Sequence, residues 1–127
     1  MRELSFTDRE LDVMAVLWQL GSATVPEVRE RIADPLAYTT VQTVLRILEE
    51  KGHVDHVVEG RFHRYHPLVD REEAGRGALG RVLAKIFAGS PEELLTHFLS
   101  QRDLSADQLR RIREILDSHA AKKRERP

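Results

Sequence analysis

The sequence predicts a mostly α-helical chain that carries one small β-hairpin. Three observations lead to this prediction. Apolar residues recur at helical spacing through most of the chain, several of these stretches open with a capping signature, and β-prone residues fill positions 53–66. We expect an N-terminal part, residues 1–70, and a C-terminal part, residues 71–127, because only helical patterns follow the hairpin.

Composition excludes several classes of protein. The 127 residues include no Cys, which removes disulfides, thiolate metal sites and cysteine catalysis. No apolar run approaches the roughly 18 residues that span a bilayer, so we expect a cytoplasmic protein without membrane insertion. Residues 1–70 contain 8 Lys+Arg against 12 Asp+Glu, a net charge of −4. Any binding of nucleic acid must therefore depend on where the basic side chains lie, not on their number.

Capping signatures predict where the first two helices begin. In Thr7-Asp8-Arg9-Glu10 and in Thr24-Val25-Pro26-Glu27, a Thr precedes a Glu by three residues, so each side chain can bond the other residue's amide. An apolar stripe runs from Leu11 to Trp18 in the first helix. The second helix is short, because Asp34-Pro35 breaks the chain and the residue before Pro avoids the α region.

The stretch from Tyr38 to Gly52 predicts a third helix with two distinct faces. One face carries an apolar stripe at positions 41, 44, 45 and 48, while the other has short polar side chains, one Arg and no carboxylate before Glu49. Taken alone, this pattern also fits an ordinary surface helix. After a short helix and a turn, it is typical of a recognition helix in a helix-turn-helix. The residues that we expect to face the DNA major groove are Tyr38, Thr39, Thr40, Gln42, Thr43 and Arg46.

A β-hairpin is predicted after the third helix. The β-prone runs His53–Val58 and Arg61–His66 are joined by Glu59-Gly60, and Pro67 ends the second strand. A hairpin directly after a recognition helix forms the wing of a winged helix-turn-helix. We expect Arg61, His63 and Arg64 in this wing to contact the DNA backbone.

Three further helices are predicted in residues 71–127. The first, Asp70 to Ala88, contains three glycines in its first half, and we expect a bend, a frayed start or a hinge there. Capping boxes at Ser90–Glu93 and Ser105–Gln108 open the other two. A segment of this size is marginal as an independent domain, so we expect these helices to pair with a second copy. The expected dimerisation residues are Leu83, Ile86, Phe87, Leu94, Leu95, Phe98, Leu99, Leu109, Ile112 and Leu116.

Together these segments resemble the penicillinase-repressor family, the BlaI/MecI/CopY group of winged-helix repressors. The resemblance rests on Thr7 to Trp18, Tyr38–Arg46 with Lys51-Gly52, Gly60–Tyr65 with Pro67, and His97–Leu99 with Asp103–Ser105. It implies a homodimeric, sequence-specific repressor whose N-terminal winged helix binds an inverted-repeat operator in double-stranded DNA. By this resemblance, the repressor would control genes of β-lactam resistance or related genes.

The resemblance also implies a partner and a candidate cleavage site. In the family, a membrane-bound sensor protease triggers cleavage of the repressor at an Asn-Phe bond in the dimerisation segment. The matching bond in this chain is His97–Phe98, in which the Phe is kept and the Asn is not. The copper-responsive branch of the family uses a C-terminal cysteine cluster, which this chain lacks.

Three other functions compete with DNA binding. His53, His56, His63 and His66 crowd into the hairpin and invite a zinc hypothesis. Residues three apart in a strand point to opposite faces, so neither His-x-x-His pair chelates by itself, although cross-strand pairs stay open. We predict no metal and no cofactor.

The sequence has no nucleophile elbow and no phosphate-binding glycine loop in a strand–helix context, so we expect no enzymatic activity. The alternative function is a winged-helix module that binds protein, which the acidic excess in residues 1–70 favours.

Overall fold

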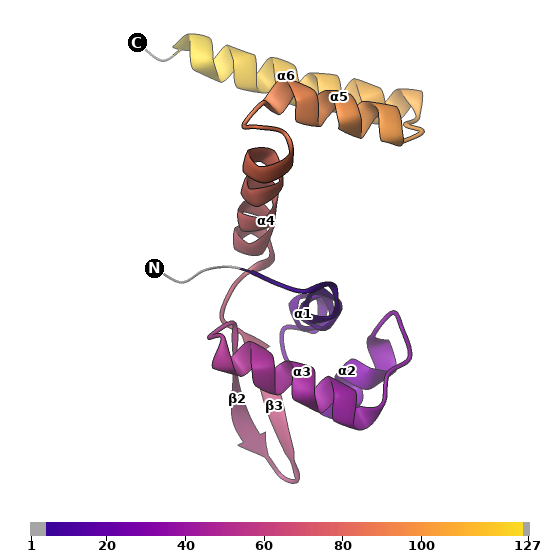
Figure 1. Cartoon of the computed structure of the whole chain (residues 1–127), viewed down its shortest axis with the longest axis vertical. Helices are drawn as coiled ribbons and strands as arrows, with labels where there is room; N and C mark the ends of the chain where they lie inside the picture. The colour runs from indigo at the N-terminus through magenta and orange to yellow at the C-terminus, as the bar shows by residue number, and fades with distance from the viewer. Residues whose placement is uncertain (1–4, 126–127) are drawn as a thin grey trace. The chain divides into compact units, whose positions relative to one another are not determined.

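In a computed structural model of the chain, residues 5–125 are described, and the chain divides into two compact units, Met1–Arg81 (unit 1) and Val82–Pro127 (unit 2) (Figure 1). The elements before this division are α1 (Asp8–Leu20), β1 (Ala23–Thr24), α2 (Val25–Arg31), α3 (Tyr38–Glu50), β2 (Val54–Glu59) and β3 (Phe62–Pro67). Helix α4 (Arg71–Ile86) spans the division, and unit 2 also contains α5 (Pro91–Gln101) and α6 (Ala106–Glu125). Among the described residues, no helix combines the length and apolar character needed to cross a membrane.

Both predicted capping boxes of unit 1 are confirmed. The Thr7 hydroxyl accepts a hydrogen bond from the Glu10 amide at 3.1 Å, and the Glu10 carboxylate accepts one from the Thr7 amide at 2.8 Å. Thr24 and Glu27 form the same reciprocal pair at 3.4 and 2.8 Å. Each box satisfies amides that the first turn of a helix leaves without partners, which fixes where α1 and α2 begin.

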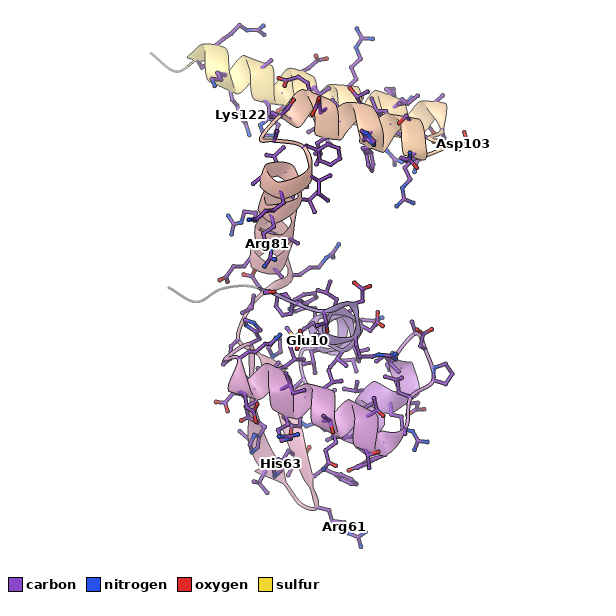
Figure 2. The ribbon with its side chains drawn as sticks, in the orientation of Figure 1. Glu10, Arg61, His63, Arg81, Asp103 and Lys122 are labelled. Carbon is purple, nitrogen blue, oxygen red and sulfur yellow. The ribbon has the colours of Figure 1, made fainter. Side chains whose placement is uncertain are left out.

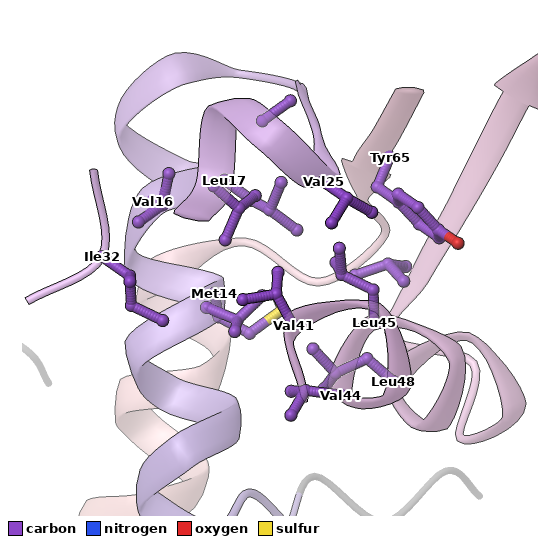
Figure 3. Close-up of a cluster of buried hydrophobic side chains, with 14 residues drawn as sticks. Met14, Val16, Leu17, Val25, Ile32, Val41, Val44, Leu45, Leu48 and Tyr65 are labelled. Carbon is purple, nitrogen blue, oxygen red and sulfur yellow. The ribbon is translucent and has the colours of Figure 1, made fainter. Parts of the chain in front are cut away.

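The core of unit 1 forms where α1, α2 and α3 meet the sheet (Figure 3). The predicted stripe of α3 is confirmed, because its members are all buried against α1 and α2. Trp18 packs against the edge of this core, and its Nε1 donates a hydrogen bond to the Val69 carbonyl at 2.8 Å. Burial of a Leu or Val side chain contributes about 1.5–3 kcal/mol, so this cluster holds α3 firmly in one orientation. Its largest fully buried members include Met14, Leu17, Val28, Val41, Leu45 and Leu48.

The wing is an antiparallel hairpin within a three-stranded sheet of order β1-β3-β2. The predicted turn, Glu59-Gly60, was wrong by one residue. Glu59 pairs with Phe62, so the turn consists of Gly60 and Arg61. Gly60 has φ +60°, and the two-residue turns of hairpins require such a positive φ at their first position. The sequence also gave no indication of β1, whose two residues pair with Arg64 and Tyr65 of β3.

The last three helices agree only in part with the expectations. Helix α4 is continuous from Arg71 to Ile86, so its glycines do not interrupt it, while a bend or a hinge at these glycines stays a prediction. The Ser90–Glu93 capping box is only half formed. The Ser90 hydroxyl accepts from the Glu93 amide at 3.2 Å, but the Ser90 amide donates to the Phe87 carbonyl instead of to Glu93. The box that opens α6 is complete, with Ser105 and Gln108 bonded in both directions at 2.9 and 3.1 Å.

Unit 2 lacks a buried core in the part of the chain that the structure describes. Every residue from 82 to 125 is half-buried or exposed. Exposed large apolar side chains occur on all three helices and include Ile86, Phe98, Leu99, Leu109, Ile115 and Leu116. Five of the ten predicted dimerisation residues are among these exposed side chains, and the other five are half-buried.

Candidate nucleic-acid interface

Helix α3 presents a mostly polar face opposite its buried stripe, and Ile47 is the large apolar side chain exposed on this helix. Its exposed members include five of the six residues predicted to face the major groove: Thr39, Thr40, Gln42, Thr43 and Arg46. The sixth, Tyr38, is half-buried and packs against the core. Arg46 lies 3.4 Å from Glu50, but both side chains are largely exposed, so this pair adds little stability and leaves the guanidinium accessible.

A partly buried ion pair anchors the C-terminal end of α3 to the start of α1. Lys51 Nζ lies 2.9 Å from Glu10 Oε1, and the Glu10 side chain is almost completely buried. Burial by itself would raise the pKa of Glu10, but hydrogen bonds from the Thr7 amide and from Lys51 outweigh it and hold the pKa below its ordinary value. The capping box of α1 therefore also helps to position α3.

Arg61 and Arg64 have different surroundings, although the sequence predicted the same role for both. Arg61 is exposed and projects from the hairpin turn (Figure 2). Arg64 Nε lies 2.6 Å from a carboxylate oxygen of Glu59, and its Nη1 lies 3.1 Å from one of Glu27. The bond to Glu59 and the charge of Glu27 raise the pKa of Arg64 above its ordinary value. Two carboxylates compensate this guanidinium and tie α2 to the wing, so Arg61 is the stronger candidate for contact with phosphate.

The third predicted wing residue, His63, belongs to a stack of aromatic rings. Its ring lies parallel to that of His56, with an interplanar angle of 6° and a centroid distance of 4.0 Å. His56 Nδ1 in turn lies 2.7 Å from Glu49 Oε2, which connects the wing to α3. The sequence did not identify Glu49 or His56 as a pair, because seven residues and a change of element separate them.

The arrangement offers two kinds of chemistry to a nucleic acid. Hydroxyl and amide groups on an exposed helix face can hydrogen-bond to base edges, and an Arg on the same face can bind guanine through two bonds. An Arg at a hairpin tip can pair with phosphate. The structure brings the five exposed α3 residues onto one face and leaves Arg61 exposed at the wing tip. These six side chains are therefore all accessible to a nucleic acid. Base and phosphate contacts by these residues stay predictions.

Comparison with known proteins identifies close relatives. The family described as "Penicillinase repressor" matches residues 6–118. The "Penicillinase repressor" of Bacillus licheniformis is 29% identical over 121 residues, which cover 94% of this chain and 94% of the relative. The "Transcriptional regulator BlaI" of Mycobacterium tuberculosis is 36% identical over 113 residues, covering 86% and 80%. The solution structure of the DNA-binding domain of the repressor BlaI aligns with a TM-score of 0.51 and 33% identity, covering 56% of this chain and 89% of that domain.

Proposed function

The chain belongs to the penicillinase repressor family, and we propose that it is a transcriptional repressor that binds an inverted-repeat operator as a homodimer. The observation that carries the proposal is the exposed polar face of α3 in a winged-helix unit. That unit is similar to the DNA-binding domain of a repressor. As a repressor, the protein would act in the cytoplasm on the bacterial chromosome, and the proposal assigns it no enzymatic activity.

Direct contact with bases is proposed for the exposed residues of α3. The buried stripe and the Glu10–Lys51 pair fix the helix, so the backbone positions that carry its polar side chains are set before any ligand arrives. Gln42 would bond adenine and Arg46 guanine, the bases whose edges match an amide and a guanidinium. Arg61 would contact phosphate from the wing, and His63 and Arg64 would support the wing's position more than bind DNA themselves.

Dimerisation is proposed for unit 2 on the basis of its unburied apolar side chains. Isolated short helices are marginal in water, and most of the stability of a helix in a protein comes from burying its apolar face. In unit 2, Phe98 is 46% exposed and Leu116 is 52% exposed. A second copy of the chain would cover these side chains and would also place two winged helices on the two halves of an inverted repeat.

Relief of repression by a sensor protease is the least direct part of the proposal. The candidate bond, His97–Phe98, lies inside helix α5, so cleavage requires this helix to unwind locally. Helix α5 contains no buried residue, and few tertiary contacts therefore oppose such unwinding. By the family resemblance, cleavage at this bond would relieve repression of β-lactam resistance or related genes.

A fluorescence-anisotropy titration tests the repressor proposal. The full chain would be titrated onto the duplex upstream of its own gene and onto a shuffled duplex of equal length, at two salt concentrations. We expect binding to the first duplex to be about a thousandfold tighter or more, the range typical of specific regulators. Equal, salt-sensitive binding to both would reject sequence-specific recognition of that site. No binding to either duplex at low salt would contradict the proposal and favour the protein-interaction module.

A further inference from the structure

The wing meets the C-terminal end of α3 in a cluster of three metal-ligating side chains. Glu49 comes from α3, and Asp55 and His56 come from β2. One imidazole nitrogen and one oxygen from each carboxylate all lie within 4.8 Å of one another. Although the sequence led us to predict no metal, we propose from this cluster that Glu49, Asp55 and His56 bind a divalent transition-metal ion such as Zn²⁺.

The three ligand atoms lie near enough together for small side-chain movements to bring them around one metal ion. Zinc binds nitrogen and oxygen at about 2.0–2.2 Å, so tetrahedral ligand atoms lie roughly 3.3–3.5 Å apart. His56 Nδ1 lies 2.7 Å from Glu49 Oε2, and a metal between them requires these atoms to separate slightly. The Glu49 side chain is 30% exposed at the end of a helix and has room for that movement.

Neighbouring groups hold two of the three ligands in place. The His56 ring stacks on His63 with a centroid distance of 4.0 Å and contacts Tyr65 at 5.4 Å, which restricts its rotation. Asp55 Oδ1 accepts a hydrogen bond from the His56 amide at 2.8 Å, and its second oxygen remains for an ion. Such supporting contacts orient metal ligands and reduce the entropy lost on binding.

The charge and chemistry of the cluster favour a transition metal. Two carboxylates and one imidazole carry a net negative charge whether or not the ring is protonated, and a divalent cation would neutralise it. Nitrogen from imidazole suits zinc, nickel or copper, whereas calcium and magnesium prefer oxygen ligands alone. A hydrogen-bonded pair between His56 and Glu49 would not depend on the Asp55 carboxylate, so the effect of Asp55→Asn on zinc affinity separates a metal site from an ion pair.

A bound ion would connect the two elements of the candidate DNA interface. Glu49 lies on the same helix as the exposed polar face, and Asp55 and His56 lie on the first strand of the wing. Metal would therefore fix the wing against α3 and remove negative charge near both. This consequence rests on the proposed function, but the site itself does not, since metal binding can be measured without DNA.

Calorimetric titration of the tag-free full chain with Zn²⁺ tests the site. We expect one ion per chain and a loss of affinity of at least about tenfold for Asp55→Asn and for His56→Gln, because second-shell changes alone cost that much in known sites. His119→Gln is the matched control, because it removes an exposed imidazole from α6, outside the cluster. Its affinity for zinc should equal that of the wild type.

Several results would overturn the proposal. These are no saturable binding by the wild type, unchanged affinity in Asp55→Asn, or an equal loss in His119→Gln. Because a variant could fail to fold, a nuclear magnetic resonance titration of the wild type provides a second measurement. Zinc should shift the imidazole signals of His56, and shifts of other histidines without a shift of His56 would reject the site.

Discussion

The two units of this chain use similar local signals but bury very different amounts of apolar surface. Complete capping boxes open α1 and α2 in unit 1 and α6 in unit 2. Unit 1 nevertheless buries side chains from α1, α2, α3 and the sheet in one core, whereas no described residue of unit 2 is buried. Capping and amphipathic spacing therefore specify helices, but only packing against other elements makes a stable domain.

The largest predicted effect is the difference in unfolding free energy between two Leu→Ala substitutions, one in each unit. Leu45→Ala removes a side chain that is 0% exposed, and Leu116→Ala removes one that is 52% exposed. Leu45→Ala should lower the free energy of unfolding of unit 1 by about 2–5 kcal/mol, through lost burial and a cavity. Leu116→Ala should leave that free energy unchanged.

Trp18 provides the measurement for both variants. It is the only Trp in the chain and packs against the core of unit 1, so its fluorescence during urea unfolding follows that unit. The measurement should use a concentration at which the protein is monomeric. If Leu116→Ala then lowered the unfolding free energy of unit 1 as much as Leu45→Ala does, the stability of unit 1 would depend on unit 2, which would contradict this account.

The next effect concerns assembly and compares two phenylalanines. Phe98 in α5 is 46% exposed and Phe62 in the wing is 37% exposed. Phe98→Ala should weaken the proposed dimer by about 2–5 kcal/mol, because we propose that a second copy buries this ring when it covers unit 2. Phe62→Ala should leave the dimer intact.

Sedimentation velocity over a range of protein concentrations measures this difference. The dissociation constant should rise in Phe98→Ala only. If both substitutions weakened the dimer equally, the dimer interface would involve both units. That result would contradict the proposal that unit 2 alone dimerises.

DNA contact should separate residues within unit 1. Gln42→Ala should cost about 1–3 kcal/mol on the preferred operator and nothing on a shuffled duplex, because an amide discriminates bases. Arg61→Ala should weaken binding to both duplexes and reduce the salt slope by about one, because it removes a phosphate contact.

Arg113→Ala in α6 is the control and should change neither the affinity for DNA nor the salt slope. Anisotropy titrations at several salt concentrations provide all three comparisons, and equal losses on both duplexes for Gln42→Ala would argue against base recognition.

The smallest effect should come from the ion pair that anchors α3. Glu10 has a pKa below its ordinary 4.5, so its contribution to stability is present above that value and is lost as pH falls through the lower, folded pKa. Glu10→Gln should cost about 1–2 kcal/mol at neutral pH, since hydrogen bonds to a charge become neutral ones. The variant should also lose stability less steeply below about pH 4.5. Urea unfolding from pH 3 to 7 measures both effects, and parallel pH profiles for the two proteins would contradict this role.

Local sequence signals predicted the helices of unit 1 well. A Thr followed three residues later by a Glu fixed the starts of α1 and α2, and the spacing of apolar residues identified the buried side of α3. These features depend on residues within one or two turns of each other, so the sequence alone contains them.

The missed features depend on distant residues. Strand β1 exists because Ala23 and Thr24 pair with β3, about forty residues later in the chain. The position of Arg64 between Glu27 and Glu59 also follows from this pairing, and it favours a structural role for Arg64 over the predicted contact with DNA. The turn was misplaced because either position of a two-residue loop can take Gly, and only the register of the strands decides between them.

Hydrogen exchange of the full chain, measured at two protein concentrations, tests most directly whether the units depend differently on a partner. One concentration should lie below the dissociation constant of the dimer and one well above it. We expect the amides of α1 and α3 to be protected equally at both, and those of α5 and α6 to gain protection only at the higher concentration. Equal and strong protection of α5 and α6 in the monomer would show that unit 2 is stable alone and would contradict this account.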